Sequence, residues 1–291
     1  MREFQLDIAV GRIHGLRQGE PGQPRVLALH GWLDNAASFL PLAAHLPGLD
    51  LVAVDLPGHG RSVHLPPGAD YSFAGALHTV LDIADALGWE RFALLGHSMG
   101  AGIASLLAAA SPQRVARLVA IEALGALPEQ EENTVERLRD AVATGRTLGG
   151  KRLRMFTELD TPVRARTLAR TGAISEDAAR LLVERGVREV QGEDGGRGWV
   201  WSSDPRLTLP TLVRMTPGQV RALIRGIECP TRVIHADPPQ RYLPEPMRSA
   251  HAALLPDGEL HVLPGGHHLH MERPAAVAAA IGEFLHASPA G

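Results

Sequence analysis

The chain has 291 residues, of which 45% are hydrophobic and 21% charged. This composition excludes a disordered protein and is typical of one large domain or a domain with an insertion. The formal net charge of −3 excludes the basic surface that binds nucleic acids or anionic membranes. A single cysteine, Cys229, excludes an internal disulfide framework and a cysteine-rich metal site.

The amino terminus lacks the features of a secreted or membrane protein. Residues 1–7 contain no apolar core of a signal peptide. The longest apolar run, residues 101–110, contains Ser105 and is shorter than the roughly 18 residues of a transmembrane helix. We therefore expect a cytoplasmic protein without a membrane span.

Short apolar runs alternate with helical patterns along most of the chain. Runs typical of buried strands cover residues 25–30, 51–54, 92–95, 118–121, 231–235 and 260–263. Helical spacing covers residues 71–87, 99–110 and 274–285, and residues 3–18 are expected to form an antiparallel hairpin at one edge. Strands that are apolar on both faces are typical of a parallel sheet covered by helices. The alternation predicts an α/β fold with a mostly parallel, doubly wound sheet.

This alternation is interrupted between about residues 124 and 226. Arginine-rich helical patterns cover residues 134–144, 162–170 and 176–185 there. A compact chain seldom spends about 100 residues as plain loop. We therefore predict a core domain formed by residues 1–123 and 227–291, with residues 124–226 inserted as a helical cap.

The strongest signal for chemistry is the pentapeptide Gly96-His97-Ser98-Met99-Gly100, between the apolar run 92–95 and an alanine-rich helical pattern. A G-x-S-x-G sequence between a strand and a helix forms a nucleophile elbow, in which the serine lies on a strained turn. The bare pattern also fits a tight turn with an unreactive serine. Its position between strand and helix favours Ser98 as a nucleophile.

A serine hydroxyl needs a nearby base to react at neutral pH. The stretch Gly266-His267-x-x-His270-x-Glu272-x-Pro274, before the last helical pattern, resembles the terminal signature of the α/β hydrolases. The resemblance implies that His267, the first histidine after the glycine, is the base, with His268 as the alternative. A polar loop and a metal site from His267, His268 and His270 are the other interpretations. We expect no metal, because no carboxylate or thiolate cluster accompanies these histidines.

The stabilising groups for an oxyanion are expected on two backbone segments. His30-Gly31-Trp32 follows the first buried run and resembles the oxyanion loop of the same family. An oxyanion hole needs two backbone donors near the reacting carbonyl. The resemblance implies that these are the amides of Trp32 and Met99, and that the His30 side chain braces the loop without transferring a proton.

The acid of the triad departs from the common family pattern. It usually follows the strand after the cap, in a segment such as G-x-x-D-x-x-x-P, but the aspartate position falls here on Pro239, and Asp237 is two residues early. Some α/β hydrolases, haloalkane dehalogenases among them, carry the acid before the cap, where this chain has Glu122. Because the carboxyl ends of parallel strands build the site, we predict Glu122 as the acid and Asp237 as its alternative. A helix-start carboxylate or a salt bridge to a cap arginine is the other interpretation of Glu122.

The whole chain resembles the serine hydrolase-like (kraken-type) branch of the α/β hydrolases. The similarity lies in residues 30–39, 95–100, 181–186 and 201–207. It implies a cofactor-free serine hydrolase, most simply a carboxylic-ester hydrolase with a small-molecule acyl substrate. Thioesters, lactones, amides and C–C bonds share this machinery, and a catalytically weak fold that senses or binds a small ligand is the alternative function.

Candidate substrate-binding residues are His97, beside the nucleophile, and three apolar cap residues, Trp199, Trp201 and Leu207. Apolar side chains commonly line an acyl pocket. The alternative for the cap residues is that they form the small core of the cap itself.

Overall fold

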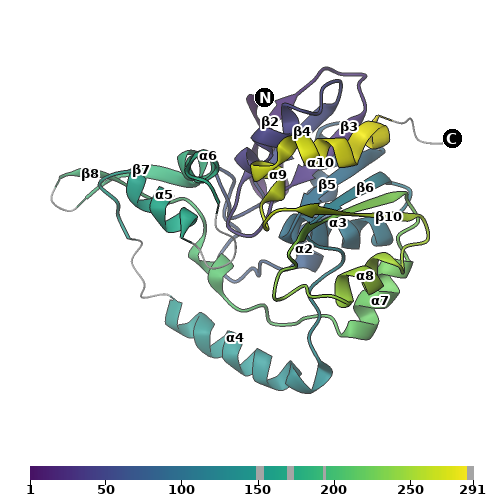
Figure 1. Cartoon of the computed structure of the whole chain (residues 1–291). Coiled ribbons are helices and arrows are strands. Elements are labelled where there is room, and N and C mark those ends of the chain that lie inside the picture. Colours follow the sequence, from purple (N-terminus) through teal and green to yellow (C-terminus); the bar gives the residue numbers. More distant parts are fainter. Residues whose placement is uncertain (149–153, 169–173, 193–194, 287–291) are drawn as a thin grey trace.

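The computed structural model describes residues 1–148, 154–168, 174–192 and 195–286, and it contains one eight-stranded sheet with the strand order β1-β2-β4-β3-β5-β6-β9-β10 (Figure 1). The strands are β1 Arg2–Ile8, β2 Gly11–Gln18, β3 Arg25–Leu29, β4 Asp50–Val54, β5 Phe92–His97, β6 Val115–Ile121, β9 Thr231–Asp237 and β10 Gly258–Pro264. The β1–β2 and β2–β4 pairs are antiparallel, and all other pairs are parallel. The predicted fold class and the predicted edge hairpin are confirmed.

Helices cover both faces of the sheet, as expected for strands that are apolar on both sides. The helices and turns of this part are η1 Ala36–Phe39, α1 Leu40–Ala43, α2 Phe73–Ala86, α3 Met99–Ala110, α8 Met247–Ala252, α9 Leu269–Glu272, α10 Pro274–Ile281 and η4 Gly282–Leu285. Alternate residues of β3 point to opposite faces: Leu27 packs in one hydrophobic cluster with α2 and α3, and Val26 packs in a second with α1 and α10. The sheet is therefore doubly wound.

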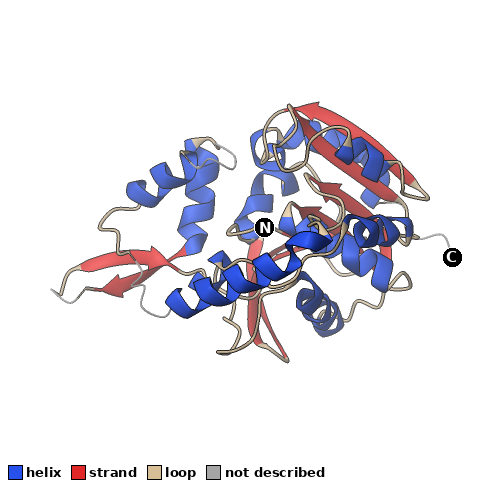
Figure 2. Ribbon diagram, turned by 90° about the horizontal axis from the view of Figure 1, so that it is seen from below, coloured by secondary structure: helices blue, strands red, loops and turns tan. Residues whose placement is uncertain are grey.

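Residues 124–226 contain further helices and a second sheet. Their elements are η2 Glu131–Asn133, α4 Thr134–Leu148, α5 Asp160–Thr167, α6 Glu176–Gly186, β7 Val187–Gln191, β8 Arg197–Trp201, η3 Pro205–Thr208 and α7 Pro217–Arg225. The helical patterns at 134–144 and 176–185 lie in α4 and α6, whereas residues 169 and 170 of the third pattern lie outside the described residues. The antiparallel β7–β8 hairpin was not predicted. Figure 2 shows α5, α6 and this hairpin beside the sheet domain.

Two parts of this predicted insertion pack differently. Four buried α6 residues, from Ala178 to Val183, form a cluster with Val163 of α5 and with Met271 from the core. The α7 helix instead buries Val220 and Ile224 in the sheet's own cluster, beside Ile103 of α3. The domain limits 123/124 and 226/227 stay predictions, but the side chains of α7 belong with the core.

Among the described residues, no helix combines the length and the apolar character needed to cross a lipid bilayer.

Candidate active site

Ser98 lies on a sharp turn between β5 and α3. Its φ of 52° and ψ of −116° lie outside the regions that L-residues favour, so the surroundings must hold this conformation. A Cβ at Gly96 would lie 2.4 Å from the Cα of Ala101, and one at Gly100 would lie 1.9 Å from the carbonyl oxygen of Leu29. Glycine is therefore required on both sides of Ser98 for strand and helix to approach closely.

His267 lies in the loop between β10 and α9 and reaches Ser98. Its Nε2 atom is 3.0 Å from the Ser98 Oγ, which is hydrogen-bond distance. The carbonyl oxygen of His267 lies 2.9 Å from the Nε2 of His97. The side chain of His97 is fully buried, and its contact with this carbonyl holds the His267 loop in place.

Glu122 follows the last residue of β6 and faces the other nitrogen of the same imidazole. Its Oε2 lies 3.2 Å from the Nδ1 of His267, and its Oε1 accepts a 2.6 Å hydrogen bond from the amide of Ala236. Burial alone would raise the pKa of Glu122, but the imidazoles of His235 and His267 and the Ala236 amide favour the carboxylate and lower the pKa to about 2. Glu122 is therefore ionised at neutral pH.

Asp237, the alternative acid, is at the end of β9 with an exposed side chain. Its carbonyl oxygen accepts a hydrogen bond from the amide of Gly265, but its carboxylate is not part of the cavity wall that contains Ser98 and Glu122. The structure thus brings Glu122, and not Asp237, to His267.

The loop after β3 brings Trp32 to the same cavity as Met99. His30 is fully buried, and its Nε2 accepts a hydrogen bond from the amide of Leu56 at 3.0 Å. Burial lowers the pKa of His30 to about 4, so this side chain braces the loop as a neutral imidazole. In the described part of the chain, the backbone amides of Trp32 and Met99 have no protein acceptor, and they are free to bind a ligand oxygen.

These residues open into a cavity of about 760 Å³ between the carboxyl edge of the sheet and residues of the predicted cap. Its apolar lining residues include Phe73, Ile103, Leu127, Leu207, Leu209 and Leu243. The volume is in the range of small-molecule sites, and such apolar walls suit an acyl chain. Among the three cap residues predicted to bind the substrate, Leu207 lies in the wall of this cavity.

Three predicted substrate-binding residues lie outside the wall of this cavity, and their role stays a prediction. His97 is buried below the His267 loop and is absent from the cavity wall. Trp199 of β8 pairs through its backbone with Phe156. Trp201 packs against the hydrophobic cluster of α5 and α6, and it lines a separate cavity of about 420 Å³. The alternation of side chains along β8 does not predict which hydrophobic cluster each tryptophan joins. That depends on how the β7–β8 hairpin packs against the rest of the chain.

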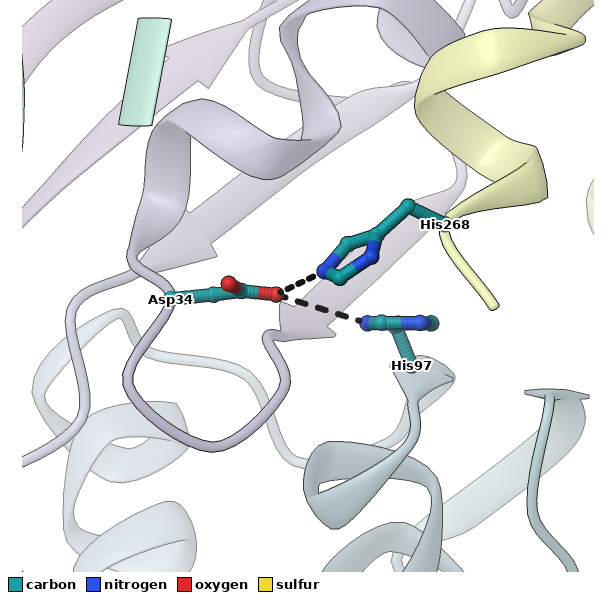
Figure 3. Close-up of side chains that lie close together, drawn as sticks. All are labelled: Asp34, His97 and His268. Carbon is teal, nitrogen blue, oxygen red and sulfur yellow. Dashed lines mark hydrogen bonds and ion pairs between the residues drawn. The ribbon is translucent and has the colours of Figure 1, made fainter. Parts of the chain in front are cut away.

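The sequence did not identify a buried polar group that lies beside the candidate triad. The carboxylate of Asp34 lies between His268, whose Nε2 is 3.1 Å away, and His97, whose Nδ1 is 3.7 Å away (Figure 3). Arg166 of α5 pairs with the same carboxylate. The two imidazoles and the guanidinium hold the pKa of Asp34 well below its usual value despite the opposing effect of burial.

Asp34, His97 and His268 are also the one group of described residues whose spacing suggests a metal ion. Their candidate ligand atoms all lie within 4.8 Å of one another, but the Asp34 carboxylate already bonds to the imidazole of His268. Arg166 already supplies a positive charge to Asp34. The group therefore fits a hydrogen-bonded network better than a metal site, and the expectation of no metal stays a prediction.

Tyr242 is the second residue that the sequence analysis missed. Its hydroxyl lies 2.9 Å from the Nδ1 and 3.3 Å from the Nε2 of His267, and the residue lines the cavity. It belongs to the loop between β9 and α8, where no motif in the sequence marks it.

Comparison with known proteins gives a consistent assignment. A model of the alpha/beta hydrolase fold matches residues 24–194. A serine hydrolase-like protein from Dictyostelium discoideum is 30% identical over 90% of this chain and 74% of that protein. The crystal structure of a hypothetical protein from Pseudomonas aeruginosa is 39% identical, with a TM-score of 0.89 over 98% of both chains. The thioesterase domain from the curacin biosynthetic pathway is 27% identical, with a TM-score of 0.80 over 97% of this chain and 98% of that one.

The chain therefore belongs to the α/β-hydrolase family, in its serine hydrolase-like branch.

Proposed function

We propose that this protein is a cofactor-free serine hydrolase that cleaves carboxylic esters through an acyl-enzyme on Ser98. The observation that carries the proposal is the hydrogen-bonded series formed by Ser98 Oγ, His267 and Glu122, with distances of 3.0 and 3.2 Å at the two imidazole nitrogens. Such a series is the arrangement that activates a serine hydroxyl.

In the proposed mechanism, the Oγ of Ser98 attacks the ester carbonyl carbon while the Nε2 of His267 takes its proton. The carboxylate of Glu122 holds the Nδ1–H and balances the imidazolium charge. The amides of Trp32 and Met99 stabilise the oxyanion of the tetrahedral intermediate. The imidazolium then protonates the leaving alcohol, and water hydrolyses the acyl-enzyme by the same steps.

The acyl part of the substrate is proposed to lie along the apolar cavity wall that includes Leu207. The likeness to a thioesterase domain makes thioesters the second bond type to test, because both substrates react through an acyl-enzyme. The alternative, a binding module without turnover, predicts an unreactive Ser98.

The first test is covalent labelling with a fluorophosphonate together with hydrolysis of 4-nitrophenyl esters. Ser98→Ala should abolish labelling and lower kcat by about 10⁶, the loss seen when a triad nucleophile is removed. Ser105→Ala is the matched control, because Ser105 is a buried serine of the same segment that bonds to the carbonyl of Ala101. Ser105→Ala should keep both the labelling and the hydrolysis of 4-nitrophenyl esters. A folded wild-type protein that is neither labelled nor active would contradict the proposal.

A further inference from the structure

Tyr242 occupies a position that the Ser–His–Glu series does not require. Its hydroxyl is close to both ring nitrogens of His267, at 2.9 and 3.3 Å. The hydroxyl is therefore close to both nitrogens and is not in line with either one. The two rings are nearly perpendicular, at 83°, and Tyr242 therefore presents its hydroxyl, and not its ring face, to the imidazole.

Tyr242 also belongs to the wall of the main cavity. Tyr242 lines the 760 Å³ cavity with Ser98 and is 40% exposed. Among the described residues, His267 is the only hydrogen-bond partner of its hydroxyl. The oxygens of Glu122 bond to the Ala236 amide and to His267, and within the described residues no hydrogen bond joins this carboxylate to Tyr242, so the hydroxyl can turn towards a ligand.

The place beside Nε2 is where the leaving group must lie. When the tetrahedral intermediate collapses, the electron pair of the breaking C–O bond moves to the leaving oxygen, and this oxygen takes the proton from Nε2 at about 2.6–3.2 Å. An oxygen at that distance from Nε2 can also lie within hydrogen-bond reach of a hydroxyl that is 3.3 Å from the same nitrogen.

We propose that Tyr242 is a further catalytic residue, whose hydroxyl donates a hydrogen bond to the leaving oxygen of the ester while His267 protonates it. Tyr242 keeps its own proton throughout, so the step remains balanced by the proton of His267 alone. This inference rests on the proposed function, since it assigns a role within the same reaction.

The electrostatic surroundings of the Tyr242 hydroxyl favour a role as hydrogen-bond donor and not as a base. Burial and the nearby carboxylate of Glu122 raise the pKa of Tyr242 above its ordinary value. The hydroxyl is therefore protonated over the whole working range of a histidine base.

Tyr71, the other of the chain's two tyrosines, provides a matched control. It also lines the cavity, but its hydroxyl donates to Asp204 at 2.8 Å and accepts from the amide of Leu65 at 2.9 Å. Both bonds hold loops together, so the loss of this hydroxyl should affect stability without distinguishing between leaving groups.

The experiment compares kcat/KM of the wild type, Tyr242→Phe and Tyr71→Phe for the 4-nitrophenyl, phenyl and ethyl esters of one acid. The constant kcat/KM is the right measure, because it reports acylation, in which the leaving group departs. Tyr242→Phe should cost less than about 3-fold with 4-nitrophenyl, which leaves readily without help, and about 10- to 100-fold with ethyl, whose oxygen develops more negative charge. Tyr71→Phe should change kcat/KM by the same factor for all three esters.

An equal loss of kcat/KM for all three esters in Tyr242→Phe would overturn the proposal and would assign Tyr242 to positioning His267. No loss for any ester would also overturn it. Thermal unfolding of each variant separates a folding defect from these outcomes. If the wild type hydrolyses none of the esters and is not labelled by a fluorophosphonate, the proposed function fails, and that result differs from either outcome for Tyr242.

Discussion

Two residues with unusual backbone conformations orient the candidate triad. Ser98 and Glu122 both have positive φ angles, of 52° and 60°, and each directly follows a parallel strand. A residue in this conformation turns the chain sharply, and the conformation persists only when the surrounding structure enforces it. The backbone amides of these two residues are anchored to the neighbouring strands. The amide of Ser98 donates to the carbonyl of Ile121, and that of Glu122 donates to the carbonyl of Ile234. The strained turns therefore direct both side chains to the carboxyl edge of the sheet.

At the scale of single residues, the variant Glu122→Gln tests whether Glu122 is the acid of the proposed triad. The glutamine oxygen would keep the bond from the Ala236 amide, and its NH₂ group would then face the Nδ1 of His267. This favours the tautomer with hydrogen on Nε2, which cannot accept the proton of Ser98. We expect kcat to fall by about 10⁴ with little change in melting temperature.

Asp237→Asn is the matched control for the acid, because its exposed side chain carries the alternative carboxylate. It should retain activity within about 3-fold, as expected for a surface substitution that touches no reacting group. A severe loss in Asp237→Asn with an active Glu122→Gln would reverse the assignment.

At the scale of elements, one cap helix is attached to the sheet domain through a buried ion pair. Arg185 near the end of α6 is 4% exposed, and its Nε lies 2.9 and 3.1 Å from the two carboxylate oxygens of Asp55. Its Nη1 donates to Glu3 of β1 at 2.7 Å. Asp55 follows β4 and also accepts from the amides of Ala36 and Arg61. One carboxylate thus connects α6 to two loops of the core.

Removal of this arginine should destabilise the protein strongly. Arg185→Met leaves the buried charge of Asp55 without its partner, and the loss of one partner of a buried pair costs about 3–5 kcal/mol. The measurement is the free energy of unfolding in urea. Arg180→Met on the same helix removes an exposed pair with Asp160 and Glu176 and should cost less than about 1 kcal/mol. Equal costs for the two variants would show that Arg185 does not attach the helix.

At the scale of the whole molecule, the main cavity exists because distant segments meet. The indole Nε1 of Trp32 donates to the carbonyl oxygen of Leu207 at 2.8 Å, which joins the candidate oxyanion loop to η3. The amide of Asp204 donates to the carbonyl of Gly58 at 2.8 Å. These bonds place Leu207 opposite the sheet, where it lines the cavity, while Trp201 is directed into the cluster of α5 and α6.

This arrangement predicts different effects for two apolar substitutions. Leu207→Ala enlarges the main cavity and should shift the preferred ester towards longer acyl chains, measured as kcat/KM over a series of 4-nitrophenyl esters. Trp201→Ala removes a large side chain from the cap packing, and it should lower the stability by about 3–5 kcal/mol and leave the chain-length preference unchanged. A shift in preference for Trp201→Ala alone would move the substrate to the smaller cavity.

The sequence by itself was sufficient for the fold and for the Ser98 turn, because both depend on short-range rules. Apolar runs and helical spacing identify strands and helices within about ten residues, and Gly96 reflects a close approach to Ala101 within one strand–turn–helix unit. The choice between His267 and His268 came from a family signature, and the structure places the Nε2 of His267 at Ser98 and that of His268 at Asp34.

Only the tertiary structure decided which carboxylate faces His267 and which side chains enclose the cavity. Glu122 directly follows β6 and Asp237 is the last residue of β9, so both lie at the carboxyl edge of the sheet, and only the direction of the chain at each place distinguishes them. Tyr242 lies in a loop without a motif, and Trp199, Trp201 and Leu207 look alike as apolar residues. Their places depend on how segments far apart in the chain pack together, and no local pattern of residues contains that information.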